Sequence, residues 1–151
     1  MITRFERFSF AIAEIDRCWH KLAAEEMEKY GLNSAHAVYL NTLYQNSDGI
    51  TAAQLSELCG KDKSDVSRMV TIMEKKGLVY KEGTGKNLYR ALLKLTDKGK
   101  EAAEHVQRRA ALAVELAGNG VSNEHRAIFY HTLERITANL QTLSKEGLPQ
   151  Q

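Results

Sequence analysis

The chain has 151 residues, a formal net charge of +2, 43% hydrophobic and 26% charged residues. This balance suits one globular subunit, residues 1–151, or one domain with an extended dimerisation part. No segment approaches the ~20 apolar residues of a membrane span, and charges interleave the first twenty residues, which excludes a signal peptide. We therefore expect a cytoplasmic protein with no membrane partner.

A long helix is predicted at the start of the chain. Apolar side chains recur there at alternating steps of three and four, which makes a narrow stripe along one helix face. The stripe consists of Phe5, Phe8, Ile12, Ile15, Trp19 and Leu22, and it drifts to Ala23, Met27 and Tyr30 before Gly31 ends the helix. A stripe of this length needs a surface to pack against.

The next helix is predicted over Leu32–Gln45. Asn33 or Ser34 is expected to cap its start, and the turn at 46–49 follows its end. We expect Val38, Leu40 and Leu43 to lie in the core.

Two helices with a very short turn between them follow. Thr51 and Gln54 have the spacing of a reciprocal capping box, so a short helix should begin at Ala52, run through Leu55 and Leu58, and end at Gly60. Asp62 should cap a longer helix over Lys63–Lys76, which Gly77 ends. Its apolar positions recur at helical spacing: Val66, Met69, Val70 and Met73.

A hairpin and two more helices complete the chain. Strands are predicted over Leu78–Lys81 and Leu88–Leu95, around a Gly-rich loop at 83–87. Thr96 should cap a helix over Asp97–Ala117, and the last helix is marked by the apolar positions Phe129, Leu133, Ile136, Leu140 and Leu143. The fold class is therefore mainly α with a small β-hairpin. Residues 32–96 form a winged helix-turn-helix, and 1–31 with 97–146 form a helical part.

The helical part is larger than one small winged helix needs to bury its own core. We expect the two ends of the chain to come together in a homodimer, and a monomeric helical cap on the same domain is the alternative. Charge is also unevenly distributed: by counting, 61–100 hold eleven Lys/Arg against five Asp/Glu, whereas 1–60 and 101–151 are net negative. Such a cluster indicates either a surface for the phosphate backbone or a solvated basic face.

Four segments in register resemble the MarR/SlyA family of winged-helix transcription regulators. They are 55–58 (LSEL), 62–70 (DKSDVSRMV), 73–78 (MEKKGL) and 95–99 (LTDKG). The resemblance implies a homodimer held by the terminal helices, with two winged domains on a pseudo-palindromic operator in double-stranded DNA. It also implies a repressor that releases DNA when a small aromatic effector binds between the dimerisation part and the DNA-binding lobe.

The second helix of the motif offers a polar face opposite its apolar positions. Arg68 can bridge guanine O6 and N7 or a phosphate, and Asp65 can accept from cytosine N4 or serve as the third-position carboxylate of the cap that begins at Asp62. Lys61 and Lys63 flank the helix start and should contact phosphates. The full set of candidate DNA-binding residues in this motif is Thr51, Lys61, Lys63, Ser64, Asp65, Ser67, Arg68 and Thr71.

The predicted wing departs from the family pattern. The family usually has Asp-Xaa-Arg, in which the Arg enters the minor groove, where this chain has Asn87, Leu88 and Tyr89. A shift of one residue in a strand reverses the face of a side chain. The minor-groove contact therefore falls to Lys86 or to Arg90, with Asn87 beside them, or is missing. Tyr89 either lies against the DNA backbone or packs the wing onto its own domain.

Two further groups of residues allow alternatives. Trp19, His20, His36 and Tyr39 are either core and interface residues or the wall of an effector pocket. Cys18 suggests thiol redox sensing as a lesser alternative, although two cysteines without a CxxC motif fit a reducing compartment. We find no metal-ligand spacing and no catalytic motif, so we expect no metal, no cofactor and no enzyme. A winged-helix module for protein interaction, without specific DNA binding, remains the alternative function.

Overall fold

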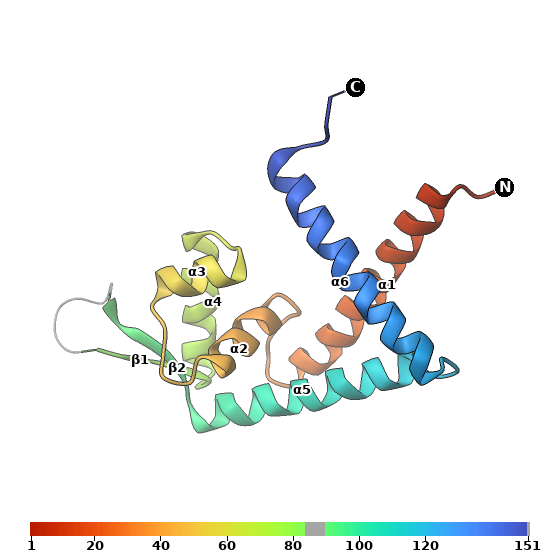
Figure 1. Cartoon of the computed structure of the whole chain (residues 1–151). Helices are drawn as coiled ribbons and strands as arrows, with labels where there is room; N and C mark the ends of the chain where they lie inside the picture. Colours follow the sequence, from red (N-terminus) through yellow and green to blue (C-terminus); the bar gives the residue numbers. More distant parts are fainter. Residues whose placement is uncertain (84–89, 151) are drawn as a thin grey trace. The chain divides into compact units, whose positions relative to one another are not determined.

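The computed structural model describes residues 1–83 and 90–150 (Figure 1). Within them the order of elements matches the predicted order and confirms the fold class. The elements are α1 (Arg4–Glu28), α2 (His36–Gln45), α3 (Ala52–Cys59), α4 (Lys63–Lys75), β1 (Val79–Glu82), β2 (Leu92–Leu95), α5 (Asp97–Ala117) and α6 (Asn123–Glu146). Contacts divide the chain into two compact units, residues 1–111 and 112–151. The division into a winged helix-turn-helix for DNA binding (32–96) and a helical part for dimerisation (1–31 and 97–146) stays a prediction.

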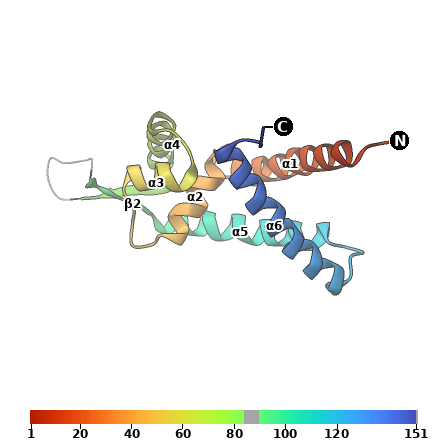
Figure 2. The same cartoon turned by 45° about the horizontal axis from the view of Figure 1, so that its top comes forward.

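The core of the first unit lies mainly among α2, α3, α4 and the hairpin, which gather together in both views (Figures 1 and 2), and it includes Met27 of α1 and Ala102 and Ala103 of α5. Its largest fully buried side chains include Tyr39, Met27, Leu40, Leu43, Leu55 and Met73. The predicted core position Val38 is wrong, because it is 40% exposed. The buried residues of α2 are His36, Tyr39, Leu40 and Leu43, at helical spacings of three and four, and Val38 lies off that stripe.

The ends of α3 and α4 form as local chemistry predicts. The Thr51 hydroxyl accepts from the Gln54 backbone N–H at 3.2 Å, and the Gln54 side chain accepts from the Thr51 N–H at 2.9 Å. Gly60 ends α3 with φ 63°, a left-handed conformation that favours glycine. Asp62 caps α4 by accepting from the Asp65 N–H at 2.7 Å. The turn between the two helices is therefore fixed by capping on both sides.

The predicted start of α2 is wrong. Neither Asn33 nor Ser34 caps the helix, which begins at His36. The Asn33 side chain instead accepts from the Ala35 N–H at 3.0 Å, and the Asn33 N–H donates to His36 Nδ1 at 3.1 Å. Asparagine side chains offer the backbone such local alternatives to a helix, which delays the first turn.

The hairpin is antiparallel and is attached to the core at its base. Val79 pairs with Leu95 and Glu82 with Leu92, and Ile50 forms an isolated bridge to Leu93. In the described residues the second strand starts at Leu92, later than predicted, while residues 88 and 89 lie outside the described residues. A Cβ added at Gly99 would lie 2.1 Å from the carbonyl oxygen of Leu78, so α5 starts in close contact with the hairpin.

Both terminal helices carry exposed apolar side chains. On α1, Phe5 is 76% and Ile15 61% exposed, and on α6, Phe129 is 52% exposed. All of α6 is described, and it buries no residue. In the second unit, Arg126 holds the turn before α6 by donating to the Gly118 carbonyl at 3.0 Å and to Glu115 at 3.2 Å. Across the described residues, no helix is long and apolar enough to cross a membrane.

Candidate nucleic-acid interface

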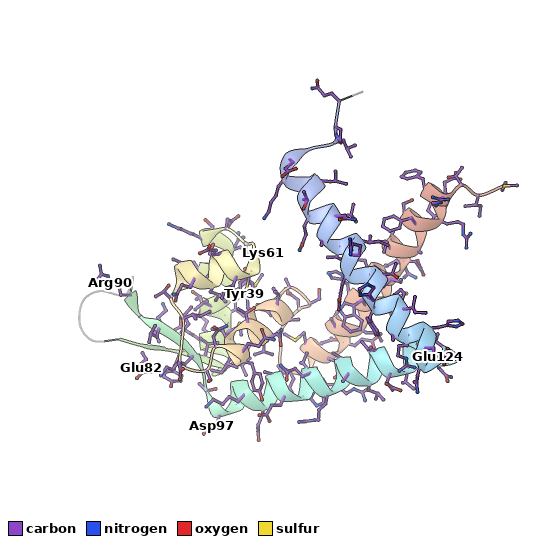
Figure 3. The ribbon with its side chains drawn as sticks, in the orientation of Figure 1. Tyr39, Lys61, Glu82, Arg90, Asp97 and Glu124 are labelled. Atoms are coloured by element: carbon purple, nitrogen blue, oxygen red, sulfur yellow. The ribbon has the colours of Figure 1, made fainter. Side chains whose placement is uncertain are left out.

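The outer face of α4 is the candidate surface for DNA. Val66, Val70 and Met73 fix the helix by turning into the core. The opposite side exposes Ser64, Ser67, Arg68 and Thr71, and Lys61 and Lys63 are exposed at the helix start. The structure thus exposes these predicted residues along one side of α4 and at its start, where Figure 3 labels Lys61.

The candidate side chains differ in the ion pairs and hydrogen bonds that they already form within the chain. Arg68 is 72% exposed, and its one ion pair in the described residues is with Asp65 at 3.4 Å. Neither Lys61 nor Lys63 is in an ion pair within the part of the chain that is described, so both are available to phosphates. Thr71 donates to the Ser67 carbonyl at 2.8 Å, and the Thr51 hydroxyl serves the α3 cap. Lys61 and Lys63 thus have no ion pair in the described residues, whereas Arg68 has one.

Asp65 has a partner that the sequence did not suggest. Its backbone N–H is capped by Asp62, but its carboxylate turns to the Tyr39 hydroxyl, which donates to Asp65 Oδ2. The predicted role of Asp65 as the third-position carboxylate of the cap that begins at Asp62 is therefore not observed, because only its backbone N–H takes part in that cap. The hydrogen bond from Tyr39, followed by that from Arg68, lowers the pKa of Asp65. Burial, and then the Asp65 carboxylate, raise the pKa of Tyr39.

The described part of the wing has few free cations. Lys94 pairs with Glu82, and Lys81 pairs with Glu74 at 3.4 Å. Arg90 is exposed at the end of the hairpin (Figure 3). Lys86, Asn87 and Tyr89 lie outside the described residues, so their predicted roles stay predictions.

The four candidates for an effector pocket do not form one group. Trp19 is 42% exposed, and His20 is exposed with Nδ1 2.9 Å from the Asp16 carbonyl oxygen. His36 and Tyr39 are buried at 2% and 0% exposure. No hydrogen bond or aromatic contact in the described residues joins the first pair to the second. The pocket stays a prediction.

His36 and Cys18 have distinct surroundings. Burial lowers the pKa of His36, whose Nε2 has no hydrogen-bond partner within the described chain. Cys18 is exposed, with Sγ 3.7 Å from both Glu14 and Arg17. No cluster of three or more His, Cys, Asp or Glu side chains that could hold a metal ion occurs in residues 1–83 and 90–150.

A cluster around Glu26 was missed from the sequence. The Glu26 carboxylate accepts from Lys29 at 2.7 Å and from Arg109 at 2.8 Å, and lies 2.9 Å from His105 Nε2. These contacts, led by those from Lys29 and Arg109, lower the pKa of Glu26 to about 2. They join the end of α1 to α5, so they fix two helices that flank the winged lobe. No local spacing signals a pair of residues 83 positions apart.

Comparison with known proteins gives a consistent result. Residues 30–87 match the model of the MarR family. A MarR transcriptional regulator from Methanosarcina mazei has 22% identity and a TM-score of 0.77, with 91% of this chain and 92% of that chain covered. A MarR family regulator from Listeria monocytogenes, solved with a 26mer DNA, has 22% identity and a TM-score of 0.73, covering 93% and 95%.

MepR, the regulator of a Staphylococcus aureus multidrug efflux pump, has 19% identity and a TM-score of 0.71, over 88% of this chain and 98% of that chain. At such identities the likeness shows the fold. With the family match, it confirms the resemblance predicted from the four sequence segments. Residues 30–87 thus match the MarR family model, and the described chain has the winged-helix fold of MarR regulators.

Proposed function

We propose that this protein is a transcriptional regulator that binds a pseudo-palindromic operator as a homodimer. The observation that carries the proposal is the exposed face of α4. It presents Arg68, and the start of the helix is flanked by Lys61 and Lys63, neither of which forms an ion pair within residues 1–83 and 90–150. In a helix-turn-helix the second helix enters the major groove with its N-terminal residues toward the bases. The relative from Listeria monocytogenes was solved with DNA, which supports this use of the fold.

The exposed stripes on α1 and α6 support the dimer. Phe5, Phe8, Ile15 and Phe129 are 41–76% exposed, and burying the exposed part of each against a second copy contributes roughly 1 to 2 kcal/mol. A dimer sets the separation of two α4 helices. Half-sites one helical turn apart require about 34 Å between them.

The mode of control is a further part of the proposal. We propose a repressor that leaves its operator when a small aromatic effector changes the separation of the two α4 helices. A ligand shifts such an equilibrium only by its difference in affinity for the two states. The effector therefore has to contact residues that differ between them, and the prediction from sequence names Trp19, His20, His36 and Tyr39.

A salt series on the DNA upstream of the protein's own gene tests DNA binding. Two lysines from each of two subunits correspond to four phosphate contacts, which together contribute about −3.6 to the slope of log affinity against log salt. The double variant Lys61→Ala/Lys63→Ala should therefore make the slope shallower by about 3.6. Lys75→Ala, at the exposed far end of the same helix, is the matched control and should leave it unchanged.

The possible outcomes separate the proposal from its alternative. A footprint on the upstream DNA whose affinity falls steeply with salt supports the regulator. Absence of protection at every salt concentration, with the protein folded, refutes it and favours a winged-helix module for protein interaction. Sedimentation at the concentrations used reports the dimer independently of DNA.

A further inference from the structure

A short series of contacts leads from the core to the exposed face of α4. The buried Tyr39 hydroxyl on α2 donates to Asp65 Oδ2, and Arg68 donates to the other oxygen, Asp65 Oδ1, at 3.4 Å. Tyr39 is fully buried, while the Arg68 side chain is 72% exposed. Figure 3 marks Tyr39 within the lobe that carries α4. Both oxygens of the Asp65 carboxylate thus accept a hydrogen bond, one from the buried Tyr39 and one from the exposed Arg68.

The inner contact fixes the orientation of the carboxylate. The terminal torsion of an aspartate side chain is broad and roughly two-fold, so an unrestrained carboxylate rotates. A buried tyrosine hydroxyl needs a hydrogen-bond partner, and the ionised carboxylate is a strong acceptor. With Oδ2 held by Tyr39, Oδ1 remains directed at Arg68, which lies three residues further along the same helix face.

The outer contact matters because Arg68 is long and exposed. A free guanidinium samples many rotamers and loses that freedom when it contacts a base. A carboxylate fixed beside it restricts the guanidinium before DNA arrives, and a restricted group gives up less entropy on binding.

We propose that Tyr39 and Asp65 are positioning residues that set the base preference of Arg68. This inference rests on the proposed function, because it concerns how that surface selects its operator. Tyr39 touches no DNA in this account. It acts through the carboxylate of Asp65, from the far side of α4.

The test measures discrimination between operator sequences. Binding is measured for the footprinted operator and for operators with single base-pair changes, using the wild type, Tyr39→Phe, Asp65→Asn and Arg68→Ala. The base pair at which Arg68→Ala loses discrimination is the Arg68 position. Tyr39→Phe should lower discrimination there by roughly 3- to 10-fold, while affinity for unrelated DNA stays within about twofold.

A matched control exists on the same helix. Tyr44 is also on α2, and its hydroxyl also donates to a carboxylate, that of Glu104 on α5 at 3.1 Å. Tyr44→Phe should leave discrimination unchanged. In an Arg68→Ala background, Tyr39→Phe should have no further effect at that base pair, which a general loosening of α4 would not reproduce. Asp65→Asn keeps the shape and should reproduce the loss even if Tyr39→Phe folds poorly.

Each outcome bears on one claim. A wild type that shows no preference for any upstream sequence refutes the proposed function and this inference with it. A wild type that discriminates, with both Tyr39→Phe and Asp65→Asn matching it at the Arg68 position, refutes this inference alone. Increased discrimination in either variant also refutes it, because Asp65 would then restrain Arg68 from the base.

Discussion

Replacing Glu26 by Gln removes the charge that three side chains share between α1 and α5. Lys29 and Arg109 are within 2.8 Å of its carboxylate, and His105 Nε2 is at 2.9 Å. The Glu26 side chain is only 15% exposed. Glutamine has the same size but no charge, so the change isolates the electrostatic contribution.

The pKa gives the expected magnitude. The pKa of Glu26 falls from its usual 4.5 to about 2, and at 1.36 kcal/mol per unit this corresponds to roughly 3 kcal/mol of preference for the charged form. Its partners are partly exposed and solvent screens them, so we expect about 1 to 2 kcal/mol. Because the folded pKa is lowered, this stability is present above pH 4.5 and is lost as pH falls toward 2.

Urea unfolding followed by circular dichroism, at one fixed protein concentration, measures the effect. At pH 7, Glu26→Gln should lower the free energy of unfolding by about 1 to 2 kcal/mol. The difference from the wild type should shrink between pH 5 and pH 3. Glu14→Gln, which removes an exposed pair with Arg17 on the same helix, is the control and should change little. A loss of unfolding free energy that does not change with pH, or no loss at pH 7, would refute the electrostatic role of this cluster.

Three further predictions concern packing and assembly. Gly99→Ala should destabilise the fold by about 3 kcal/mol or more in thermal unfolding, because the new Cβ would meet the Leu78 carbonyl oxygen at 2.1 Å and that backbone cannot easily move. A loss of stability below about 1 kcal/mol would contradict this close approach. Met73→Ala should lower the free energy of unfolding by about 2 to 5 kcal/mol because Met73 is fully buried. Its neighbour Ile72 is 39% exposed, and Ile72→Ala should lower it by less than about 1 kcal/mol. Phe129→Asp should shift sedimentation toward monomer at micromolar concentration while leaving the helical content unchanged, and an unaltered dimer would exclude that face from the interface.

Local features of the fold could be predicted from the sequence because local chemistry determines them. The capping pair Thr51 and Gln54, the left-handed Gly60 and the cap at Asp62 each depend on neighbours within a few positions. The predicted start of α2 is wrong, even though capping is also decided by neighbouring residues. Two side chains could cap it, and the structure uses one of them for a turn instead.

The candidate site could be predicted only in part. Periodicity placed Arg68 on the outer face of α4 and Val66 in the core. The partner of Asp65 could not be found in this way, because Tyr39 is 26 positions away and reaches it only after α2 and α4 pack together. The same holds for Glu26 and Arg109, which are 83 positions apart. Contacts of this kind depend on tertiary packing, which no single spacing encodes.

Footprinting of the wild type and Arg68→Ala on the same upstream DNA tests the central claim most directly. We expect a protected site with two-fold symmetry, whose half-sites are centred about one helical turn, or about 34 Å, apart. Arg68→Ala should relax preference at one base pair in each half-site at a cost of about 1 to 3 kcal/mol. Protection without symmetry, or equal affinity of both proteins for every sequence, would contradict an operator-binding dimer whose α4 selects the DNA.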